Sequence, residues 1–282
     1  VLAGAGSGKT RVITYRTANL IKEGVEPSNI LTVTFTNKAS DEMKQRIKKL
    51  LTHNDGNGLW TGTFHSIGNR ILSKHLNEVN RSSNYTIYNQ NDVEKLTKTI
   101  VEGMNLDKKK FEPKKLVNYI SNAKMKLVKP ENYQQELRKK DIRVSSFHQT
   151  FTKIYKKYEE LLEEHNAFDF DDLISKTIEL LRKNENILKY YQKKLKYVQI
   201  DEYQDVNHSQ YILSKMLAKP QNNIFAVGDV DQSIYGFRGA DISNILNFEN
   251  DYQDAEIIRL ERNYRSTENI IDASNKLIGN NN

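Results

Sequence analysis

The feature that most constrains this chain is a glycine-rich segment ending in lysine and threonine, Ala3-Gly4-Ala5-Gly6-Ser7-Gly8-Lys9-Thr10. Apolar Val1-Leu2 precedes it, and residues 11–18 carry apolar side chains at helical spacing. A strand end, a glycine turn and a helix start in this order are the setting of a phosphate-binding loop, or P-loop. Glycines let successive backbone N–H groups point inward, and the helix N-terminus adds partial positive charge. The segment therefore predicts a polyphosphate site, although Ala3 stands where the usual pattern has its first glycine.

Two side chains of this loop provide a positive charge and a metal ligand. Lys9 supplies a mobile cation for the β- and γ-phosphates, and the Thr10 hydroxyl is a hard oxygen ligand for Mg²⁺. The alternative is a glycine-rich turn that binds nothing, and Gly-Lys-Thr between a strand and a helix argues against it. We expect a nucleotide site with bound Mg²⁺, formed by Ala5, Gly6, Ser7, Gly8, Lys9 and Thr10.

Composition narrows the class of protein. The chain has 282 residues, of which 37% are hydrophobic and 28% charged, as in globular proteins of one large or two to three smaller domains. It contains no cysteine, which excludes disulfides and thiolate metal sites, and no apolar run of membrane-spanning length. A reducing cytoplasm is the expected location. The net charge of +7 suits a polyanionic partner, with an ordinary lysine-rich surface as the alternative.

The pattern of strands and helices predicts an α/β fold. Residues 30–35 form a β-branched run, a helix is expected to about Leu51, and a second strand is expected at 59–64. The sequence predicts further strands at 197–200, 223–227 and 256–260. Strands that alternate with helices are typical of a doubly wound parallel sheet.

Residues 90–165 differ from the rest of the chain, because their sequence has a helical pattern and is highly charged. We interpret them as a helical insertion whose basic, aromatic-interleaved surface could follow a nucleic-acid backbone. A solvated helix face is the alternative reading of each lysine. The residues concerned are Lys108, Lys109, Lys110, Lys114, Lys115, Lys124, Lys126 and Lys129, with Phe111, Tyr119 and Tyr133.

Acidic residues follow two of the expected strands. Asp201 comes directly after the apolar run 197–200, where P-loop NTPases place a metal-binding carboxylate, and Glu202 beside it suits a general base for water. Gln232 follows the strand at 223–227 and could sense a γ-phosphate. A calcium loop starting at Asp229 is excluded, because Ile234 replaces the required glycine and Ala240 the closing glutamate.

Seven sequence blocks in this order resemble the amino-terminal half of the UvrD/Rep/PcrA helicases of superfamily 1, closest to the PcrA-like bacterial branch. The blocks are Gly6-Ser7-Gly8-Lys9-Thr10, Thr34-Phe35-Thr36-Asn37-Lys38-Ala39, Thr63-Phe64-His65-Ser66, Asp169-Phe170-Asp171-Asp172-Leu173, Asp201-Glu202-Tyr203-Gln204-Asp205, Gly228-Asp229-Val230-Asp231-Gln232-Ser233-Ile234-Tyr235 and Asn263-Tyr264-Arg265-Ser266. The resemblance implies an α/β fold: a RecA-like P-loop NTPase parallel sheet with a helical insertion domain. The implied domains are a first RecA-like domain at 1–85 and 184–255, the insertion at 86–183, and the start of a second RecA-like domain at 256–282.

The resemblance also implies an activity, which is 3′-to-5′ translocation on DNA and unwinding driven by Mg-ATP. Its partners would be single-stranded and partly duplex DNA and proteins of DNA repair or replication, with no membrane. Carried over, Lys9, Thr10, Asp201 and Glu202 keep the roles given above, and Gln232 would couple the γ-phosphate to the DNA site. Arg265 would contact the γ-phosphate, Tyr264 would stack on adenine, and Arg11 would lie near the nucleotide.

The same resemblance assigns the DNA contacts. Aromatic faces accept any base, which suits a motor that does not read sequence. The family often has tryptophan where this chain has Phe237, and a bulkier residue at Gly236; Phe35 could instead be a core strand residue. Arg238 would link the nucleotide and DNA sites. The implied DNA-binding residues are Phe35, Thr36, Asn37, His65, Tyr235, Phe237 and Arg238.

Other functions remain open at this point. One is the motor part of a helicase–nuclease subunit, and another is a nucleotide-gated DNA-binding module without turnover, against which intact Lys9, Thr10, Asp201 and Glu202 argue. A small-molecule kinase would not explain the Gln232 and Arg265 blocks. We also expect the chain to be a fragment, cut at both ends, that binds nucleotide weakly and hydrolyses it poorly by itself, because transition-state charge needs donors from two lobes.

Overall fold

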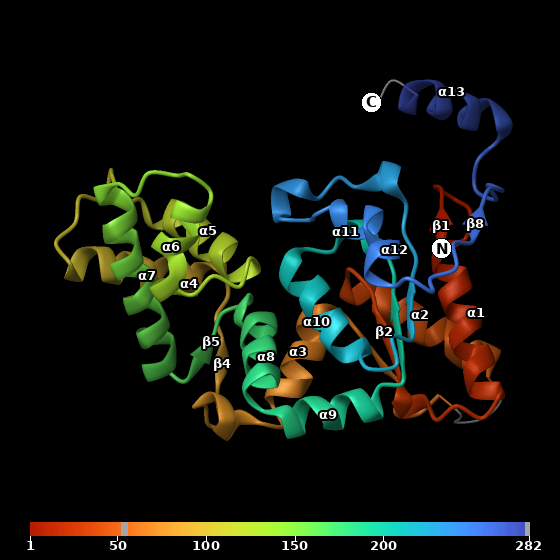
Figure 1. Cartoon of the computed structure of the whole chain (residues 1–282), viewed down its shortest axis with the longest axis horizontal. Helices are drawn as coiled ribbons and strands as arrows, with labels where there is room; N and C mark the ends of the chain where they lie inside the picture. The colour runs from red at the N-terminus through yellow and green to blue at the C-terminus, as the bar shows by residue number, and fades with distance from the viewer. Residues whose placement is uncertain (52–55, 280–282) are drawn as a thin grey trace. The chain divides into compact units, whose positions relative to one another are not determined.

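The computed structural model describes residues 1–51 and 56–279. The chain divides into two compact units, one made of Val1–Ile67 with Asn186–Asn282 and the other of Gly68–Glu185. Figure 1 shows the elements of both. The first unit contains a parallel sheet with helices, and the second is mainly helical. The four-part domain division expected from the sequence, with a second RecA-like domain from residue 256, stays a prediction.

The sheet of the first unit is entirely parallel. Four strands are hydrogen-bonded in the order β3-β2-β6-β7, and β1 pairs with β8. Backbone bonds join the two sets, since Ala3 N–H donates to Gly228 O at 3.0 Å and Gly228 N–H donates to Val1 O at 3.1 Å. The strands are β1 (Leu2–Ala3), β2 (Ile30–Val33), β3 (Trp60–Gly62), β6 (Tyr197–Ile200), β7 (Ile224–Ala226) and β8 (Arg259–Leu260).

Helices cover this sheet on both sides, with α1 and α2 on one and α10 on the other (Figure 1). Ile13, Met43, Ile47 and Val227 are buried together where α1 and α2 meet the sheet. The helices of this unit, including two that reach its boundary, are α1 (Lys9–Lys22), α2 (Asn37–Leu50), α3 (Phe64–Leu72), α9 (Glu185–Lys194), α10 (His208–Ala218), α11 (Ser243–Leu246), α12 (Phe248–Asp251) and α13 (Glu268–Ile278).

Four strands are shorter than the sequence pattern predicts, and those expected at 59–64 and 256–260 differ most. The strand expected at 59–64 ends at Gly62, because the Thr63 hydroxyl accepts a hydrogen bond from Ser66 N–H at 3.2 Å and the chain turns into α3. The strand expected at 256–260 is limited to Arg259–Leu260, while Ile257 and Ile258 are exposed. The α/β fold with a parallel sheet and a helical insertion is confirmed.

The second unit is built from five helices and one short parallel strand pair. Its core is rich in aromatic residues, with Phe151, Tyr155 and Tyr158 of α7 fully buried. Asn89 and Ser145 cap the helices that begin after them, each through its side chain. The elements are β4 (Thr86–Ile87), α4 (Gln90–Gly103), α5 (Pro113–Met125), α6 (Tyr133–Lys139), α7 (Ser146–Glu164), β5 (Ala167–Phe168) and α8 (Asp172–Lys183).

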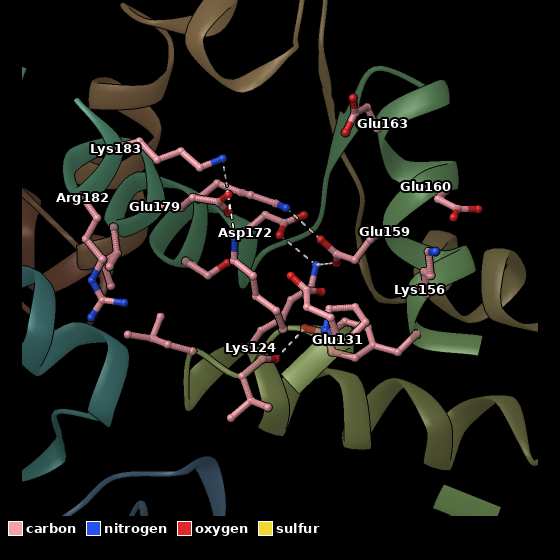
Figure 2. A pocket seen from close by; sticks show the side chains of 18 residues that line it. Lys124, Glu131, Lys156, Glu159, Glu160, Glu163, Asp172, Glu179, Arg182 and Lys183 are labelled. Atoms are coloured by element: carbon pink, nitrogen blue, oxygen red, sulfur yellow. Dashed lines mark hydrogen bonds and ion pairs between the residues drawn. The ribbon is translucent and has the colours of Figure 1, made fainter. Parts of the chain in front are cut away.

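A buried charge cluster cross-links the helices of this unit. Lys124 of α5 is 3% exposed, and its Nζ lies 2.6 Å from Glu159, 2.7 Å from Asp169 and 2.8 Å from Asp172. Figure 2 shows Lys124, Glu159 and Asp172 pointing toward one another beside a hollow of about 390 Å³. Lys176 binds the second oxygen of Glu159 at 2.8 Å. The block Asp169-Phe170-Asp171-Asp172-Leu173 therefore supplies two of the carboxylates that hold α5, α7 and α8 together.

This cluster corrects part of the sequence analysis. Lys124 was expected on a basic surface with Phe111 among its aromatics, but both side chains are buried, at 3% and 5% exposure. Neither can therefore contact a nucleic-acid backbone.

Among the described residues, no helix is both long and apolar enough to span a lipid bilayer.

Candidate active site

The P-loop connects β1 to α1 as the sequence predicts. The first residue of the helix is Lys9, preceded by Gly8 in the left-handed region at φ 100°. Gly8 has no side chain to cap the helix, so the first amides of α1 stay available to an anion. The Ser7 hydroxyl donates to Gly4 O at 2.7 Å and holds the loop in its turn. The backbone therefore has the form that a bound phosphate requires.

Lys9 is buried beneath this loop at 7% exposure. Its Nζ donates to Ala3 O at 3.2 Å and lies 3.6 Å from Asp229 Oδ2. Gln232 donates from its side-chain amide to the same carboxylate oxygen. Asp229 thus faces both of the residues that the sequence analysis assigns to the γ-phosphate side.

Asp201 follows β6 and meets the P-loop helix at Thr10. A side-chain hydrogen bond joins the Thr10 hydroxyl to the Asp201 carboxylate, and Asp201 N–H donates to Val33 O at 2.9 Å. Burial, with the charge of neighbouring Glu202, raises the pKa of Asp201 to about 6. A hydroxyl and a buried carboxylate at one point form a hard-oxygen donor set, which fits Mg²⁺.

Glu202 is half-buried beside Asp201 and has an unusual backbone. Its φ is 52°, in the left-handed region that non-glycine residues seldom adopt. Such a conformation costs about 1–3 kcal/mol and is found where the surrounding structure enforces it, often at active sites. Glu202 N–H donates to Asp201 Oδ1 at 3.1 Å, which joins the two acidic residues.

The segment Asn263–Ser266 docks on the P-loop through its backbone and one amide. Asn263 Nδ2 donates to Ala5 O at 2.6 Å, and Tyr264 N–H donates to Gly6 O at 2.9 Å. Gly6 has φ 71°, and a Cβ there would lie only 2.7 Å from Arg265 Cβ. Glycine at this position therefore allows the segment, with Arg265 and Tyr264, to approach the loop.

A cleft of about 690 Å³ adjoins this contact. Its lining includes Arg11 and Tyr15 of α1, Leu260 and Tyr264, and Ser7 and Gly8 of the P-loop. Tyr264 is 70% exposed, and the Arg262 guanidinium lies over one face of its ring, 5.2 Å from the centroid. The structure brings Arg11, Tyr264 and the P-loop to one cleft, whose size and aromatic wall suit a nucleobase.

Three of the residues expected to bind DNA form an aromatic row. The rings of Phe35 and Tyr235 are stacked with centroids 4.7 Å apart, and Tyr235 lies 6.0 Å from Phe237. Phe35 is only partly buried and Phe237 is 80% exposed. Phe35 follows β2 and Tyr235 follows β7, so the row lies at the carboxyl edge of the sheet.

The remaining expected DNA residues are more scattered. Thr36 caps α2 by accepting from Ala39 N–H at 3.1 Å, and Asn37 is the first residue of that helix. His65 lies at the start of α3, where burial lowers its pKa to about 4, so its imidazole is neutral near pH 7. The side chain of Arg238 lies outside the described part of the chain.

Four residues near this site had no assigned role in the sequence analysis: Gln204, Asp205, Asp229 and Asn263. Gln204 is fully buried and bonds to Glu202, Asp205 and the backbone of Asp229. Asn263 anchors its segment to the P-loop, as described above. Gln204 and Asp205 belong to the block that begins with Asp201 and Asn263 begins its own block, so block membership was the available signal.

The fold and this site define a P-loop nucleotide-binding protein of the α/β class, with acidic residues at the ends of neighbouring parallel strands. The domain family described as the UvrD/REP helicase N-terminal domain matches residues 1–253. The chain belongs to this family, which confirms the resemblance.

Similar proteins include the ATP-dependent DNA helicase PcrA of Staphylococcus epidermidis strain RP62A and that of Staphylococcus aureus strain Mu50. Each is 46% identical over 283 aligned residues, which cover 100% of this chain and 38% of the relative. The chain therefore spans well under half the length of these relatives.

Proposed function

We propose that this chain forms the ATP-binding part of a 3′-to-5′ DNA helicase or translocase. The observation that carries the proposal is the arrangement at one sheet edge: Lys9 under the P-loop, Thr10 bonded to Asp201, and Glu202 beside them. Phosphate, metal and water-activating groups are adjacent there, as ATP hydrolysis requires. The family and the printed names of its relatives agree with nucleotide use and a DNA substrate.

Each residue then has one task in turnover. Lys9 and the amides at the start of α1 bind the β- and γ-phosphates, and Gln232 contacts the γ-phosphate. Thr10 and Asp201 would hold Mg²⁺, which neutralises charge on the phosphate oxygens when bound. Glu202 accepts the proton of the attacking water. Arg265, docked beside Gly6, stabilises charge that develops on the γ-phosphate.

The aromatic row is proposed to carry single-stranded DNA. Phe35, Tyr235 and Phe237 present stackable faces at the sheet edge, and neutral His65 with Thr36 and Asn37 adds hydrogen-bonding groups. We propose the cytoplasm as the location, because a chain without cysteine suits a reducing compartment. We propose proteins of DNA repair or replication as partners, because the function proposed here is that of a DNA motor.

The test uses the full-length protein that contains this chain, because transition-state contacts from elsewhere in the protein count toward the rate. Lys9→Ala should abolish DNA-stimulated ATP hydrolysis, while Lys22→Ala, at the far end of the same helix, should leave it unchanged. Hydrolysis that survives Lys9→Ala would refute the proposal. A DNA-binding module without turnover would instead bind ATP and DNA with no hydrolysis in the unsubstituted protein.

A further inference from the structure

We propose that Gln204 is a positioning residue that aims the Glu202 carboxylate and couples it to the loop after β7, which carries Asp229 and Gln232. This inference rests on the proposed function, because it gives Glu202 the task of accepting a proton from water. Gln204 itself touches neither substrate nor metal in this account.

The hydrogen bonds of Gln204 reach both sides of the site. It lies in the short 3₁₀ turn η4 (Tyr203–Asp205) and is 1% exposed. Its Nε2 donates to Glu202 Oε2 at 2.9 Å, and its Oε1 accepts from Asp229 N–H at 3.0 Å. The second Nε2 hydrogen reaches Asp205 Oδ2 at 3.3 Å. One buried amide therefore connects the end of β6 to the end of β7.

The orientation of this amide is determined by its partners. A backbone N–H can only donate, so the group facing Asp229 must be the carbonyl oxygen Oε1. The NH₂ group must then face Glu202 and Asp205, whose carboxylate oxygens accept hydrogen bonds. A glutamate in place of Gln204 could keep the bond from Asp229, but it would set a carboxylate against Glu202.

Gly228 allows the amide to approach the loop after β7 closely. A Cβ at Gly228 would lie 2.9 Å from Gln204 Oε1 and 2.8 Å from Ile245 Cδ1. Such distances are too short for real contacts, so the approach of the amide to this loop requires glycine.

The Glu202 carboxylate needs a hydrogen-bond partner that fixes its direction. Its backbone is in the left-handed region, and a general base must present its oxygen to water within hydrogen-bond reach. A neutral amide donor fixes the direction of the carboxylate while adding no positive charge that would strongly lower its basicity. Glutamine is therefore better suited to this place than lysine or arginine.

Asp229 extends the connection to the phosphate-binding residues. Its carboxylate faces Lys9 at 3.6 Å and accepts from Gln232, while its backbone N–H binds Gln204. When Lys9 and Gln232 turn to a phosphate, the contacts of Asp229 change, and Gln204 transmits that change to Glu202. The base is thereby aligned together with the phosphate contacts.

The test measures DNA-stimulated ATP hydrolysis and nucleotide affinity in the full-length protein. Gln204→Glu keeps the acceptor for Asp229 N–H and loses the donor to Glu202, and Gln204→Met removes both. We expect kcat to fall about 10- to 100-fold in both variants, with the affinity for a non-hydrolysable ATP analogue unchanged. In a Glu202→Gln background, Gln204→Met should cause no further loss, because the aimed group is already absent.

The matched control is Gln199→Met, since Gln199 is equally buried on β6 but bonds to Thr17 and Thr32. It should lower thermal stability without lowering kcat. The inference is overturned if Gln204→Glu keeps kcat within about twofold of the unsubstituted protein, or if the loss persists in the Glu202→Gln background. Normal hydrolysis by Glu202→Gln alone would instead refute the role of Glu202, and the inference with it.

Discussion

The buried cluster around Lys124 allows a quantitative prediction for the helical unit. Lys124→Met keeps the length of the side chain and removes the cation from three carboxylates, which lie 2.6–2.8 Å from Nζ. Lys176 still pairs with Glu159, but Asp169 and Asp172 stay buried and lose their ion pairs with Lys124. Breaking a buried ion pair from one side costs about 3–5 kcal/mol. We expect a loss of that size in the free energy of unfolding at pH 7.5.

The same variant should show a distinctive pH dependence. Burial and the charge of Asp169 raise the pKa of Asp172 to about 6 even with Lys124 present. Without the lysine the pKa of Asp172 rises further, so the folded protein takes up a proton as the pH falls. Protonation neutralises the unpaired charge. The destabilisation should therefore be smaller at pH 5 than at pH 7.5.

Urea unfolding at both pH values measures this effect, and hydrogen exchange of the amides in α5, α7 and α8 locates it. The control is Lys115→Met, which removes an exposed ion pair to Glu112 on the same helix and should change nothing measurable. A loss below about 1 kcal/mol at pH 7.5, or a loss that grows toward pH 5, would refute the reasoning.

Three further predictions concern the first unit and the lysine-rich surface. Gly6→Ala should weaken ATP binding measured by titration, because the added methyl meets Arg265 and φ is 71°; unchanged affinity would contradict the described docking. Because burial lowers the pKa of His65 from 6.5 to about 4, protonation favours the unfolded state, and stability should fall by about 2 kcal/mol from pH 7 to pH 5. This drop should vanish in His65→Gln, and its persistence would assign it to other groups. If Lys108, Lys109 and Lys110 contact DNA, duplex affinity should decrease steeply with salt, and charge reversal of all three should reduce it; no change would remove them from the DNA path.

Much of the candidate site was predictable because it depends on short, local patterns. The P-loop is contiguous, and Asp201 with Glu202 directly follows a strand, so parallel pairing alone brings them to the same sheet edge. Phe35 and Tyr235 each follow a strand of the same sheet, yet the block pattern does not reveal that their rings stack.

Other features depend on contacts between distant parts of the chain. Two partners of Lys124, Asp169 and Asp172, lie 45 and 48 residues further on, so the neighbouring lysines did not indicate that Lys124 itself is buried. The bond of Gln204 to Asp229 spans 25 residues. Strand ends were also imprecise, because the Thr63 hydroxyl interrupts pairing where the apolar pattern continues.

The most direct test of the account is the rate of DNA-stimulated ATP hydrolysis by the Glu202→Gln variant of the full-length protein, measured beside its affinity for ATP. The carboxylate that activates water is lost while Lys9, Thr10 and Asp201 remain. We predict that ATP still binds and that kcat falls by at least about 100-fold. A variant that hydrolyses ATP at the unsubstituted rate would contradict the assignment of this sheet edge as the catalytic centre.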